Sequence, residues 1–464
     1  MSTAGAQGSR ADRPGLLIQD AQVAGRRRDV RILGGVVAEV GTHLRPRPGE
    51  PVLAAGGGAL LPGLQDHHLH LMALAAAQES LCCGPPVVTD RRGLMAALRA
   101  APGTGWLRGT SYHESVAGPL DRAALDALVP DRPVRVQHRS GALWMLNSPG
   151  LALLGLERET SPDVERDAAG RLTGRLWRWD SGLRRALGGT LPDLPAAGRL
   201  LAGLGVTGVT DATPDLDEQT TTVLRSGLVP QRLQLLGAPD HLACGAPRKL
   251  HLHDHDLPDF DRLVGWIDQA HGAGRPVAVH CVTRESLLLT LAALEQTGGA
   301  AGDRIEHAAV VPDGVAATLA RQRLRVVTQP AFVSERGDHY RREVAPEDQP
   351  GLYPYASLLA AGVPVAPSSD APFGDVDPWR AMAAAVSRQT PSGVVLGAHE
   401  RVAARQVLRG YLSPLQDPGG PPRRVRPGVP ADLCLLHVPL QEALRAPSRE
   451  LVRLVLIAGQ VSGR

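Results

Sequence analysis

The sequence predicts an α/β fold, in which a (β/α)8 barrel is accompanied by a small β-domain formed by both ends of the chain. Between residues 61 and 419, short apolar runs alternate with Ala- and Leu-rich stretches, which is the rhythm of βα units and a parallel sheet. Eight such runs can be counted, the number that closes a (β/α)8 barrel. With 464 residues, the chain is long enough for both parts.

The β-domain is expected at residues 1–60 plus 420–464. The first segment contains the runs GLLIQDAQVAG, RDVRILGGVVAEVG and PVLAAGGGALLPG. The second has the same texture in GVPADLCLLHV and LVRLVLIAGQVSG, where apolar and β-branched runs are broken by Gly and Pro. We therefore expect the two ends of the chain to pair.

The barrel strands are expected in order along the chain. They fall at residues 59–70, 205–211, 231–239, 248–253, 275–281, 303–308, 324–330 and 362–370. The run RPVRVQH at 132–138 also reads as a strand. We assign it to an insertion at about 73–200, because the stretch between the first two barrel strands is far too long for one helical crossover.

Composition excludes several classes of partner. The 50 basic and 47 acidic residues are spread through the chain and leave a net charge of +3, which indicates neither nucleic acid nor an anionic membrane as a partner. Five cysteines without a CxxC pair predict reduced thiols in a cytoplasmic protein. The sequence shows no signal-peptide core and no membrane-length apolar run. The oligomeric state stays open, with a homo-oligomer among the options.

The motif DHHLHL places two histidines at the end of the first barrel strand. His68 and His70 are two residues apart, so the strand period points both imidazoles to the same side, where they can share a metal ion. Asp66 precedes His68 by two and suits an acceptor that orients a ligand imidazole. Alone, such a pair is weak evidence, since nearby histidines are more often structural or on the surface.

Three further residues end other barrel strands. His280 closes VAVHC, His307 follows RIE, and Asp370 ends VPVAPSSD. The carboxyl ends of barrel strands line one face, so these side chains are expected to converge with the two histidines of the first strand. The nitrogen and oxygen donors suit Zn²⁺ or a similar divalent ion. The alternative is a set of unrelated side chains that cap strands.

These residues resemble a known family, the amidohydrolase superfamily, in its amidohydrolase 3 branch, which includes N-substituted formamide deformylase. The resemblance runs from about Leu16 to the C-terminus. It is carried by LLPGLQDHHLHL, LDALVPDRPVRVQHRSGALWMLNS, RDAAGRLTGRL, GVTGVTD, AHGAGRPVAVH, GDRIEHA, SSDAPFGDVDPW and PGVPADLCLL.

The resemblance implies a (β/α)8 TIM barrel with a composite β-sandwich built from both termini. It also implies that His68, His70, His280 and His307 bind one or two divalent metal ions, with Asp370 as ligand and proton shuttle. In many such enzymes a carboxylated lysine on the fourth strand bridges two metals. Others carry a glutamate there or use a single ion.

Lys249 lies on the expected fourth strand and is the only lysine in the chain. A lysine amine can become neutral in a desolvated or cationic site, whereas a guanidinium cannot, and only a neutral amine attacks CO2. An arginine-rich chain that retains one lysine here therefore suggests a carboxylated ligand. Chance, or a role as a phosphate or carboxylate clamp, is the alternative. The adjacent His251, His253 and His255 are expected to line the pocket as loop residues.

The predicted activity is hydrolysis of a non-peptide C–N bond, in an amide, cyclic amide or N-formyl group of a small-molecule substrate, by a metal-activated water. Asp370 would act as general base and then general acid. His307, or a residue of the insertion, would steady the oxyanion. Zn²⁺ is the ion expected.

Substrate contacts are expected from Gln329 at the end of the seventh strand and from polar or aromatic residues of the insertion. The insertion candidates are Tyr112, His113, His138, Trp144 and Asn147. For each of these, packing within the insertion is an equal alternative.

Three other functions compete with amide hydrolysis. Deaminases of the superfamily carry a glutamate three residues after the fifth-strand histidine, where this chain has Thr283, and Glu285 comes two residues later. An esterase or phosphoesterase would share the attack chemistry and cannot be separated by sequence. A non-catalytic barrel protein is disfavoured because every expected ligand position is filled.

Overall fold

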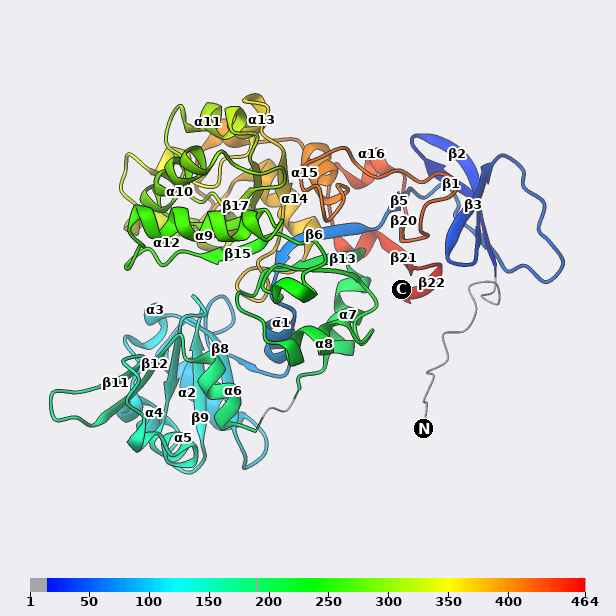
Figure 1. Cartoon of the computed structure of the whole chain (residues 1–464). Coiled ribbons are helices and arrows are strands. Elements are labelled where there is room, and N and C mark those ends of the chain that lie inside the picture. The colour runs from blue at the N-terminus through cyan, green and yellow to red at the C-terminus, as the bar shows by residue number, and fades with distance from the viewer. Residues whose placement is uncertain (1–14, 189–190, 464) are drawn as a thin grey trace, which may run out of the picture. The chain divides into compact units, whose positions relative to one another are not determined.

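The computed structural model describes residues 15–188 and 191–463. The chain divides into two compact units, of which the first consists of Met1–Leu71 together with Pro195–Arg464 and the second of Met72–Leu194. Each unit is described by itself (Figure 1).

Parallel strands form the centre of the first unit. Within its described residues they are β6 (Leu64–Leu69), β13 (Val206–Asp211), β14 (Arg232–Leu235), β15 (Arg248–His251), β16 (Val277–Cys281), β17 (Arg304–His307), β18 (Arg325–Thr328) and β19 (Val365–Pro367). One sheet has the order β14-β13-β6 and the other the order β15-β16-β17-β18-β19, with every pair parallel. All eight strand positions expected from the sequence are occupied by strands.

The eight parallel strands form two separate sheets and not one continuous closed sheet. A few backbone hydrogen bonds join their edges. At one junction the amide of Lys249 donates to Leu236 O (3.2 Å). At the other, the amide of Asp370 donates to His68 O (2.8 Å) and the amide of His70 donates to Ala371 O (2.9 Å). The edges of the two sheets are therefore neighbours at both junctions.

One predicted strand is wrong in its extent. The segment 59–70 contains two strands, β5 (Leu60–Pro62) and β6, which belong to different sheets. The break falls at Gly63, whose amide donates to Asp432 O (2.8 Å). A side chain at Gly63 would collide with Thr207, since an added Cβ would lie 2.1 Å from its Cγ2. The apolar character of the whole segment concealed this change of sheet.

Helices follow the parallel strands in alternation. In the first unit they are α7 (Leu194–Gly203), α8 (Glu218–Arg225), α9 (Phe260–Gly272), α10 (Arg284–Thr297), α11 (Val315–Arg321), α12 (Ala331–Glu343), α13 (Ala356–Ala360), α14 (Pro378–Ser387), α15 (Ala404–Tyr411) and α16 (Leu440–Ala443). Asp259 and Thr283 cap α9 and α10 by accepting from backbone amides, which fixes where these helices begin. Of these helices, α9 and α10 pack against β16 and against each other (Figure 1).

Strands from both ends of the chain share one hydrophobic core. One sheet has the order β3-β2-β1-β4 and the other β22-β21-β20-β5. Their bounds are β1 (Leu16–Val23), β2 (Arg26–Leu33), β3 (Val36–Gly41), β4 (Val52–Ala54), β20 (Leu433–Leu436), β21 (Val452–Ile457) and β22 (Gln460–Gly463). Ile18 and Ile32 lie in the same buried cluster as Leu433 and Leu456. The expectation that the two ends pair is met by β20, which pairs with β5.

The second unit is built on a sheet of order β11-β12-β10-β9-β8-β7. Its strands are β7 (Leu81–Cys82), β8 (Leu107–Tyr112), β9 (Val134–His138), β10 (Leu143–Leu146), β11 (Val164–Arg166) and β12 (Leu172–Trp177). Its helices are α2 (Arg91–Ala100), α3 (Glu114–Ala117), α4 (Arg122–Leu128), α5 (Ser148–Leu154) and α6 (Asp180–Ala186), while α1 (Leu71–Gln78) begins at the boundary between the units. The strand expected at 132–138 is β9.

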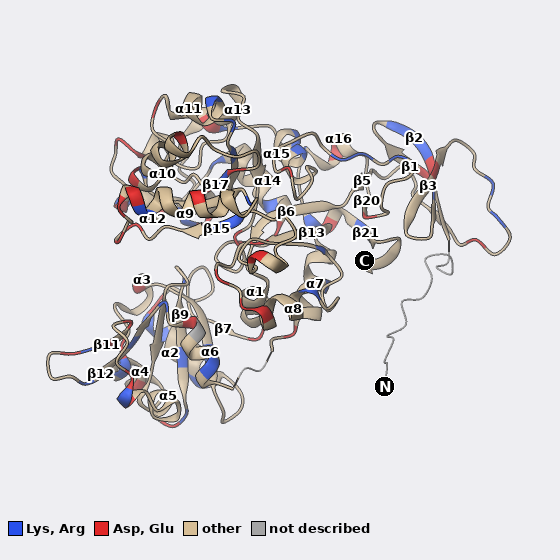
Figure 2. Ribbon diagram, viewed as in Figure 1, with Lys and Arg blue, Asp and Glu red and all other residues tan. Residues whose placement is uncertain are grey.

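Short 3-10 helices complete the described elements. They are η2 (Leu156–Arg158), η3 (Asp240–Leu242), η4 (Gln349–Gly351), η5 (Ala398–Glu400) and η6 (Arg449–Leu451). Basic and acidic residues are interspersed along the ribbon (Figure 2). Across residues 15–188 and 191–463, no helix is long and apolar enough to cross a membrane.

Candidate metal centre

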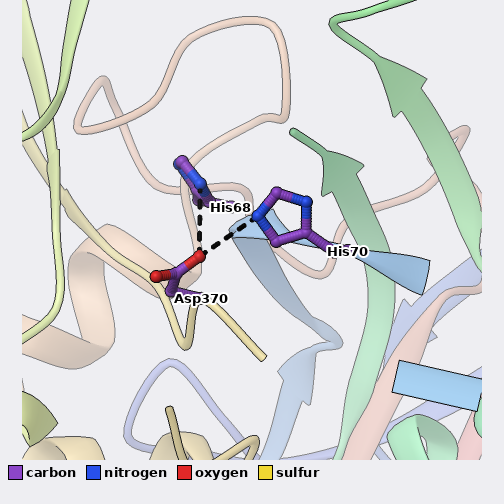
Figure 3. Close-up of side chains that lie close together, drawn as sticks. All are labelled: His68, His70 and Asp370. Carbon is purple, nitrogen blue, oxygen red and sulfur yellow. Dashed lines mark ion pairs between the residues drawn. The ribbon is translucent and has the colours of Figure 1, made fainter. Parts of the chain in front are cut away.

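His68 and His70 meet Asp370 at the carboxyl ends of their strands. Oδ1 of Asp370 lies 3.4 Å from Nε2 of His68 and 3.3 Å from Nε2 of His70 (Figure 3). One ligand atom from each residue lies within 4.8 Å of the other two. The side chain of His68 is only 1% exposed, that of Asp370 11% and that of His70 15%. Two nitrogens and an oxygen are thus directed at one largely buried point.

The other ring nitrogen of each histidine has its own partner. Nδ1 of His68 hydrogen bonds to Glu306, and Nδ1 of His70 lies 3.1 Å from the hydroxyl of Thr213. Because a carboxylate only accepts, Nδ1 of His68 is the protonated nitrogen and donates to Glu306. Nε2 of His68 then keeps its lone pair, which is the state that a metal ligand requires.

His307 is held in the same manner from a different strand. Its Nδ1 lies 2.9 Å from Oε1 of Gln329, whose Nε2 donates to the hydroxyl of Ser368 (2.8 Å). An amide oxygen only accepts, so Nδ1 of His307 is the donor. His307 has a φ of +68°, a left-handed backbone that ends the alternation of β17 and lets both Glu306 and His307 approach His68. The ring centroids of His68 and His307 are 4.8 Å apart.

His280 and Lys249 complete the inner group. The ring of His280 lies 4.5 Å from that of His307, measured between centroids. Lys249 is 7% exposed, and its Nζ has no hydrogen-bond partner among the described residues. An isolated buried ammonium is strongly disfavoured, so this nitrogen is expected either to be uncharged or to have a bound partner. Burial accordingly lowers the pKa of Lys249.

Burial favours the neutral form of the imidazoles of His68 and His280. Burial, followed by the charge of Lys249, holds the pKa of His68 well below its usual value. Burial, followed by the charge of His307, does the same to the pKa of His280. For Asp370, burial alone would raise the pKa, but the hydrogen bond from His70 and the neighbouring imidazoles lower it overall. Neutral imidazoles beside an ionised carboxylate form a donor set suited to a divalent cation.

Asp66 has a different partner from the one expected. Its Oδ1 accepts from the backbone amides of His68 (3.1 Å) and Ser369 (3.3 Å), so it ties β6 to the segment that carries Asp370 instead of orienting an imidazole. Burial raises the pKa of Asp66 to about 6. The orienting carboxylate is Glu306, which lies 238 residues from His68 in the sequence and was not anticipated.

The histidines after Lys249 lie in a row that begins at the inner group. The ring of His251 is 4.5 Å from that of His280 and 4.6 Å from that of His253. The next interval, from His253 to His255, is 6.0 Å between centroids. His251 is the last residue of β15 and approaches the centre, so it is not the loop residue that was expected. The other two rings follow in the turn after β15.

Several residues expected to contact substrate have structural partners. Gln329 is fully buried and uses both ends of its amide, on His307 and Ser368, so it positions His307. Asn147 is fully buried and caps α5, with its amide bonded to backbone atoms that include Val134 N and Val129 O. Polar residue type alone did not reveal these backbone partners.

Trp144 and Tyr112 are likewise part of the interior of the second unit. Trp144 is 3% exposed, and its indole Nε1 donates to Asp180 (2.9 Å). Tyr112 is fully buried, and its hydroxyl donates to Gly118 O (2.5 Å). Both fit the packing alternative rather than a substrate contact.

His113 and His138 form a second cluster with Glu114, in which one ligand atom from each lies within 4.8 Å of the others. Nε2 of His138 is 3.0 Å from Oε2 of Glu114, and Nε2 of His113 is 3.9 Å from the same oxygen. Nδ1 of each ring accepts from the backbone amide two residues on, at Ser115 (3.2 Å) and Ser140 (3.1 Å). The sequence did not predict this grouping.

Parallel strands followed by helices, with histidines and a carboxylate gathered at the strand ends, define the class of metal-dependent α/β hydrolases. The model of the Amidohydrolase family matches residues 52–462 of the chain. The chain belongs to this family, which confirms the resemblance seen in its motifs, and it has the α/β amidohydrolase fold.

Similar proteins point the same way. The chain is 26% identical to N-substituted formamide deformylase of Arthrobacter pascens over 82% of its own length and 84% of that protein. The crystal structure of an uncharacterized metal-dependent hydrolase from Pyrococcus horikoshii matches with a TM-score of 0.70 and 20% identity over 96% of this chain and 99% of that one.

N-isopropylammelide isopropylaminohydrolase from Burkholderia multivorans matches with a TM-score of 0.53 and 19% identity, covering 97% of this chain and 99% of that one. The two structural likenesses show the fold alone. Family membership and the deformylase relative make the chain an enzyme that hydrolyses C–N bonds in small molecules with the help of a divalent metal.

Proposed function

We propose that the chain hydrolyses an amide, cyclic amide or N-formyl C–N bond at the centre that contains His68, His70 and Asp370. One observation carries this proposal. The Nδ1 atoms of two buried histidines from different strands, His68 and His307, donate to acceptors in the protein, and the Nε2 lone pair of His68 points at the carboxylate of Asp370. Such an arrangement presents ligand atoms at a common point.

The residues fit a divalent ion, for which Zn²⁺ is our proposal because imidazole and carboxylate are its usual ligands. The proposed ligands are His68, His70, Lys249, His280, His307 and Asp370. The orphaned, buried Nζ of Lys249 supports the fit, since a bound ion or a carbamate would satisfy it. When bound, such an ion lowers the pKa of a water molecule and polarises the substrate carbonyl.

Asp370 is proposed to move the proton. Its oxygen takes a proton from the attacking water and returns it to the nitrogen as the C–N bond breaks, so an amide and water become a carboxylic acid and an amine. The carboxylate is buried and ionised at neutral pH, and hydrogen bonding from His70 keeps it so. Gln329 holds His307 in place beside this carboxylate for contact with the developing oxyanion.

We propose that the bond attacked is the C–N bond of an N-formyl or simple N-acyl group. The similarity to N-substituted formamide deformylase over most of both chains supports this choice. Since the identity is 26%, we propose only the class of bond and not the relative's own substrate.

Lys249 is proposed to be carboxylated. Its amine is buried and lacks a partner, and it lies close enough to His68 and His280 for its charge to lower the pKa of both. A neutral amine attacks CO2 to give a carbamate and release a proton, and the carbamate would offer oxygen ligands to divalent ions. The binuclear form of the site rests on this modification.

At the level of the fold, we propose that the two parallel sheets form one (β/α)8 barrel and that the terminal sheets form a composite β-sandwich. The backbone hydrogen bonds at Lys249 and Asp370 and the shared core of the chain ends support this. The second unit is proposed to be an insertion between β6 and β13. The five cysteines are free thiols, which supports a reducing, cytoplasmic location.

The proposed reaction is tested by assaying the Zn²⁺-loaded protein with a series of N-alkyl formamides and acetamides, following release of both carboxylic acid and amine. Release of the two products in equal amounts is expected. As a matched control, Asp313→Asn changes an exposed aspartate of the same unit and should leave the rate unchanged. If a fully metal-loaded protein releases neither product from any member of the series, the proposal is wrong.

Carboxylation of Lys249 is tested with two substitutions. Lys249→Glu keeps an oxygen ligand in the site, whereas Lys249→Met does not. We expect about two ions per chain in the parent protein, with the larger loss of metal in Lys249→Met. Equal metal content in the parent and in Lys249→Met would contradict a role as ligand.

A further inference from the structure

We infer that Arg336, together with the hydroxyls of Tyr340 and Tyr353, binds a carboxylate group of the substrate, so that the substrates are N-acyl compounds that carry an anionic carboxylate. This inference rests on the proposed function, because it places the binding group beside the proposed catalytic Asp370. It adds a group that recognises the substrate, which the proposed metal ligands do not do.

Arg336 lies on the face of α12 that meets the Asp370 segment. Phe332, Arg336 and Tyr340 are spaced four residues apart, so they form one stripe along the helix. The guanidinium carbon lies 4.1 Å from the ring centroid of Phe332, and Nη2 donates to the carbonyl of Phe373. Arg336 is therefore held in place beside the segment that carries Asp370.

Phe373 links Arg336 to the metal centre. Its amide donates to Asp370 O (2.8 Å), which makes Phe373 part of the turn that carries the proposed base. Its ring lies 5.2 Å from that of His70, measured between centroids. Phe373 therefore contacts the guanidinium of Arg336 and also two residues of the metal centre, His70 and Asp370.

The charge of Arg336 has no partner of opposite sign in direct contact. Among the described residues, no Asp or Glu oxygen lies within 4.0 Å of a guanidinium nitrogen of Arg336, which is the limit for an ion pair. The neighbouring Glu335 accepts from the amide of Asp375 (3.0 Å) instead. Partly buried arginines are usually paired, and an unpaired one costs stability, so a ligand anion is the natural partner. Nearby phenols and carboxylates, Asp370 among them, raise the pKa of Arg336 overall although burial alone would lower it.

Two phenols complete the anion site. The hydroxyls of Tyr340 and Tyr353 are 3.3 Å apart, and their ring centroids are 5.7 Å apart. The ring of Tyr353 also packs edge-on against Phe332, with centroids 5.6 Å apart. One of these hydroxyls donates to the other, so a carboxylate would meet the planar guanidinium and one free hydroxyl donor. A guanidinium fork is selective for planar anions.

The test compares pairs of N-formyl amino acids and their uncharged carboxamides as substrates of the Zn²⁺-loaded protein. In the parent protein, KM should be lower for the carboxylate of each pair. Arg336→Gln should raise KM for the carboxylate by about 10- to 100-fold and change KM for the carboxamide by less than about twofold. Arg336→Lys should restore part of the preference, since it keeps the charge without the fork.

Arg342→Gln is the matched control, because it removes an exposed guanidinium from the same helix. It should leave both KM values unchanged. Tyr340→Phe keeps the packing and should raise KM only for the carboxylate. Equal losses on both members of a pair in Arg336→Gln would show that Arg336 only supports the fold of the site, and would overturn the inference.

The inference and the proposed function fail in distinguishable ways. Hydrolysis without preference for the carboxylate overturns the inference alone. If neither these pairs nor the N-alkyl formamides and acetamides are hydrolysed, the proposed function fails. Binding of the N-formyl amino acid, measured by calorimetry, then decides about Arg336. Binding that is lost in Arg336→Gln supports the anion site, and equal binding to both proteins contradicts it.

Discussion

Among the residues that the structure describes, two clusters combine two histidines with a carboxylate, and they differ in which ring nitrogen carries the proton. In the first unit, Nδ1 of His68 donates to Glu306, which leaves Nε2 as a lone pair. In the second unit, Nδ1 of His138 accepts from a backbone amide, so the proton of the neutral ring is on Nε2 and points at Glu114. The first arrangement suits a metal ligand, and the second suits a hydrogen bond between neighbouring side chains.

Burial separates the clusters further. The side chain of Asp370 is 11% exposed, whereas that of Glu114 is 43% exposed. A cation at the first cluster would be shielded from water, and at the second it would compete with bulk solvent. Proximity of ligand types therefore does not define a metal site, because the hydrogen-bond partners of the ligand side chains decide which ring nitrogen is free to bind.

The largest difference is expected from removing each carboxylate. Asp370→Asn should lower kcat/KM by about 10³-fold or more, because it removes the proposed proton acceptor. Glu114→Gln should change kcat/KM by less than about threefold, since an exposed hydrogen bond contributes little. Steady-state kinetics on the best formamide substrate provide the measurement, with circular dichroism to show that both variants fold. Similar losses in the two variants would erase the distinction.

Metal content should separate the two clusters next. His70→Ala should reduce bound Zn²⁺ by about half or more, because a ring nitrogen directed at the ligand point is removed. His138→Ala should leave the metal content unchanged. Mass spectrometry of the dialysed proteins gives ions per chain. Loss of metal in His138→Ala, with full retention in His70→Ala, would reverse the assignment.

A smaller effect is expected from replacing Glu306, the carboxylate that accepts from Nδ1 of His68. Glu306→Gln should weaken metal binding by about 10- to 100-fold, as is typical when the partner of a ligand histidine is changed. The pH of half-maximal metal release should rise, because Nδ1 of His68 loses its carboxylate acceptor. Competition with a metallochromic chelator measures this. Unchanged affinity would remove Glu306 from the site.

The sequence predicted the strands and the ligand candidates because both depend on local pattern. Apolar runs ending in His280, His307 or Asp370 mark strand ends, and parallel strands place those ends together. The role of Glu306 could not be predicted, because its partner His68 is 238 residues away in the sequence. Nothing in the run RIEH distinguishes a buried hydrogen-bond acceptor from a charged residue at a sheet edge.

Asn147 and Gln329 show a different limit of residue type. Both were candidates for substrate contact, with packing as an equal alternative for Asn147, and both are fully buried and hydrogen bonded inside the protein. A side-chain amide caps helices and orients histidines as readily as it binds a ligand, so residue type could not separate these roles. The change of sheet at Gly63 was missed because β5 and β6 are both apolar.

The smallest effect concerns pH and the second cluster. Burial alone would raise the pKa of Glu114, but its own backbone amide and the imidazoles of His138 and His113 lower it overall. A carboxyl whose pKa is lower in the folded state stabilises the protein above the unfolded pKa, 4.5 here, and this stabilisation is lost as the pH falls through the folded pKa.

Parent protein should therefore exceed Glu114→Gln in thermal midpoint by about 1 °C or less at neutral pH, as expected for an exposed pair. The difference should shrink as the pH falls below about 4.5. Scanning calorimetry at several pH values follows it. A difference that grows with acidity would have the wrong sign and would contradict the lowered pKa.

The account rests on the claim that metal binds in the first unit and not in the second. A crystal of the Zn²⁺-loaded protein, with anomalous data collected on both sides of the zinc edge, tests this directly. The account predicts one or two peaks within bonding distance of His68, His70 and Asp370, and no peak between His113 and His138. A peak at His113, Glu114 and His138, with none near Asp370, would contradict it.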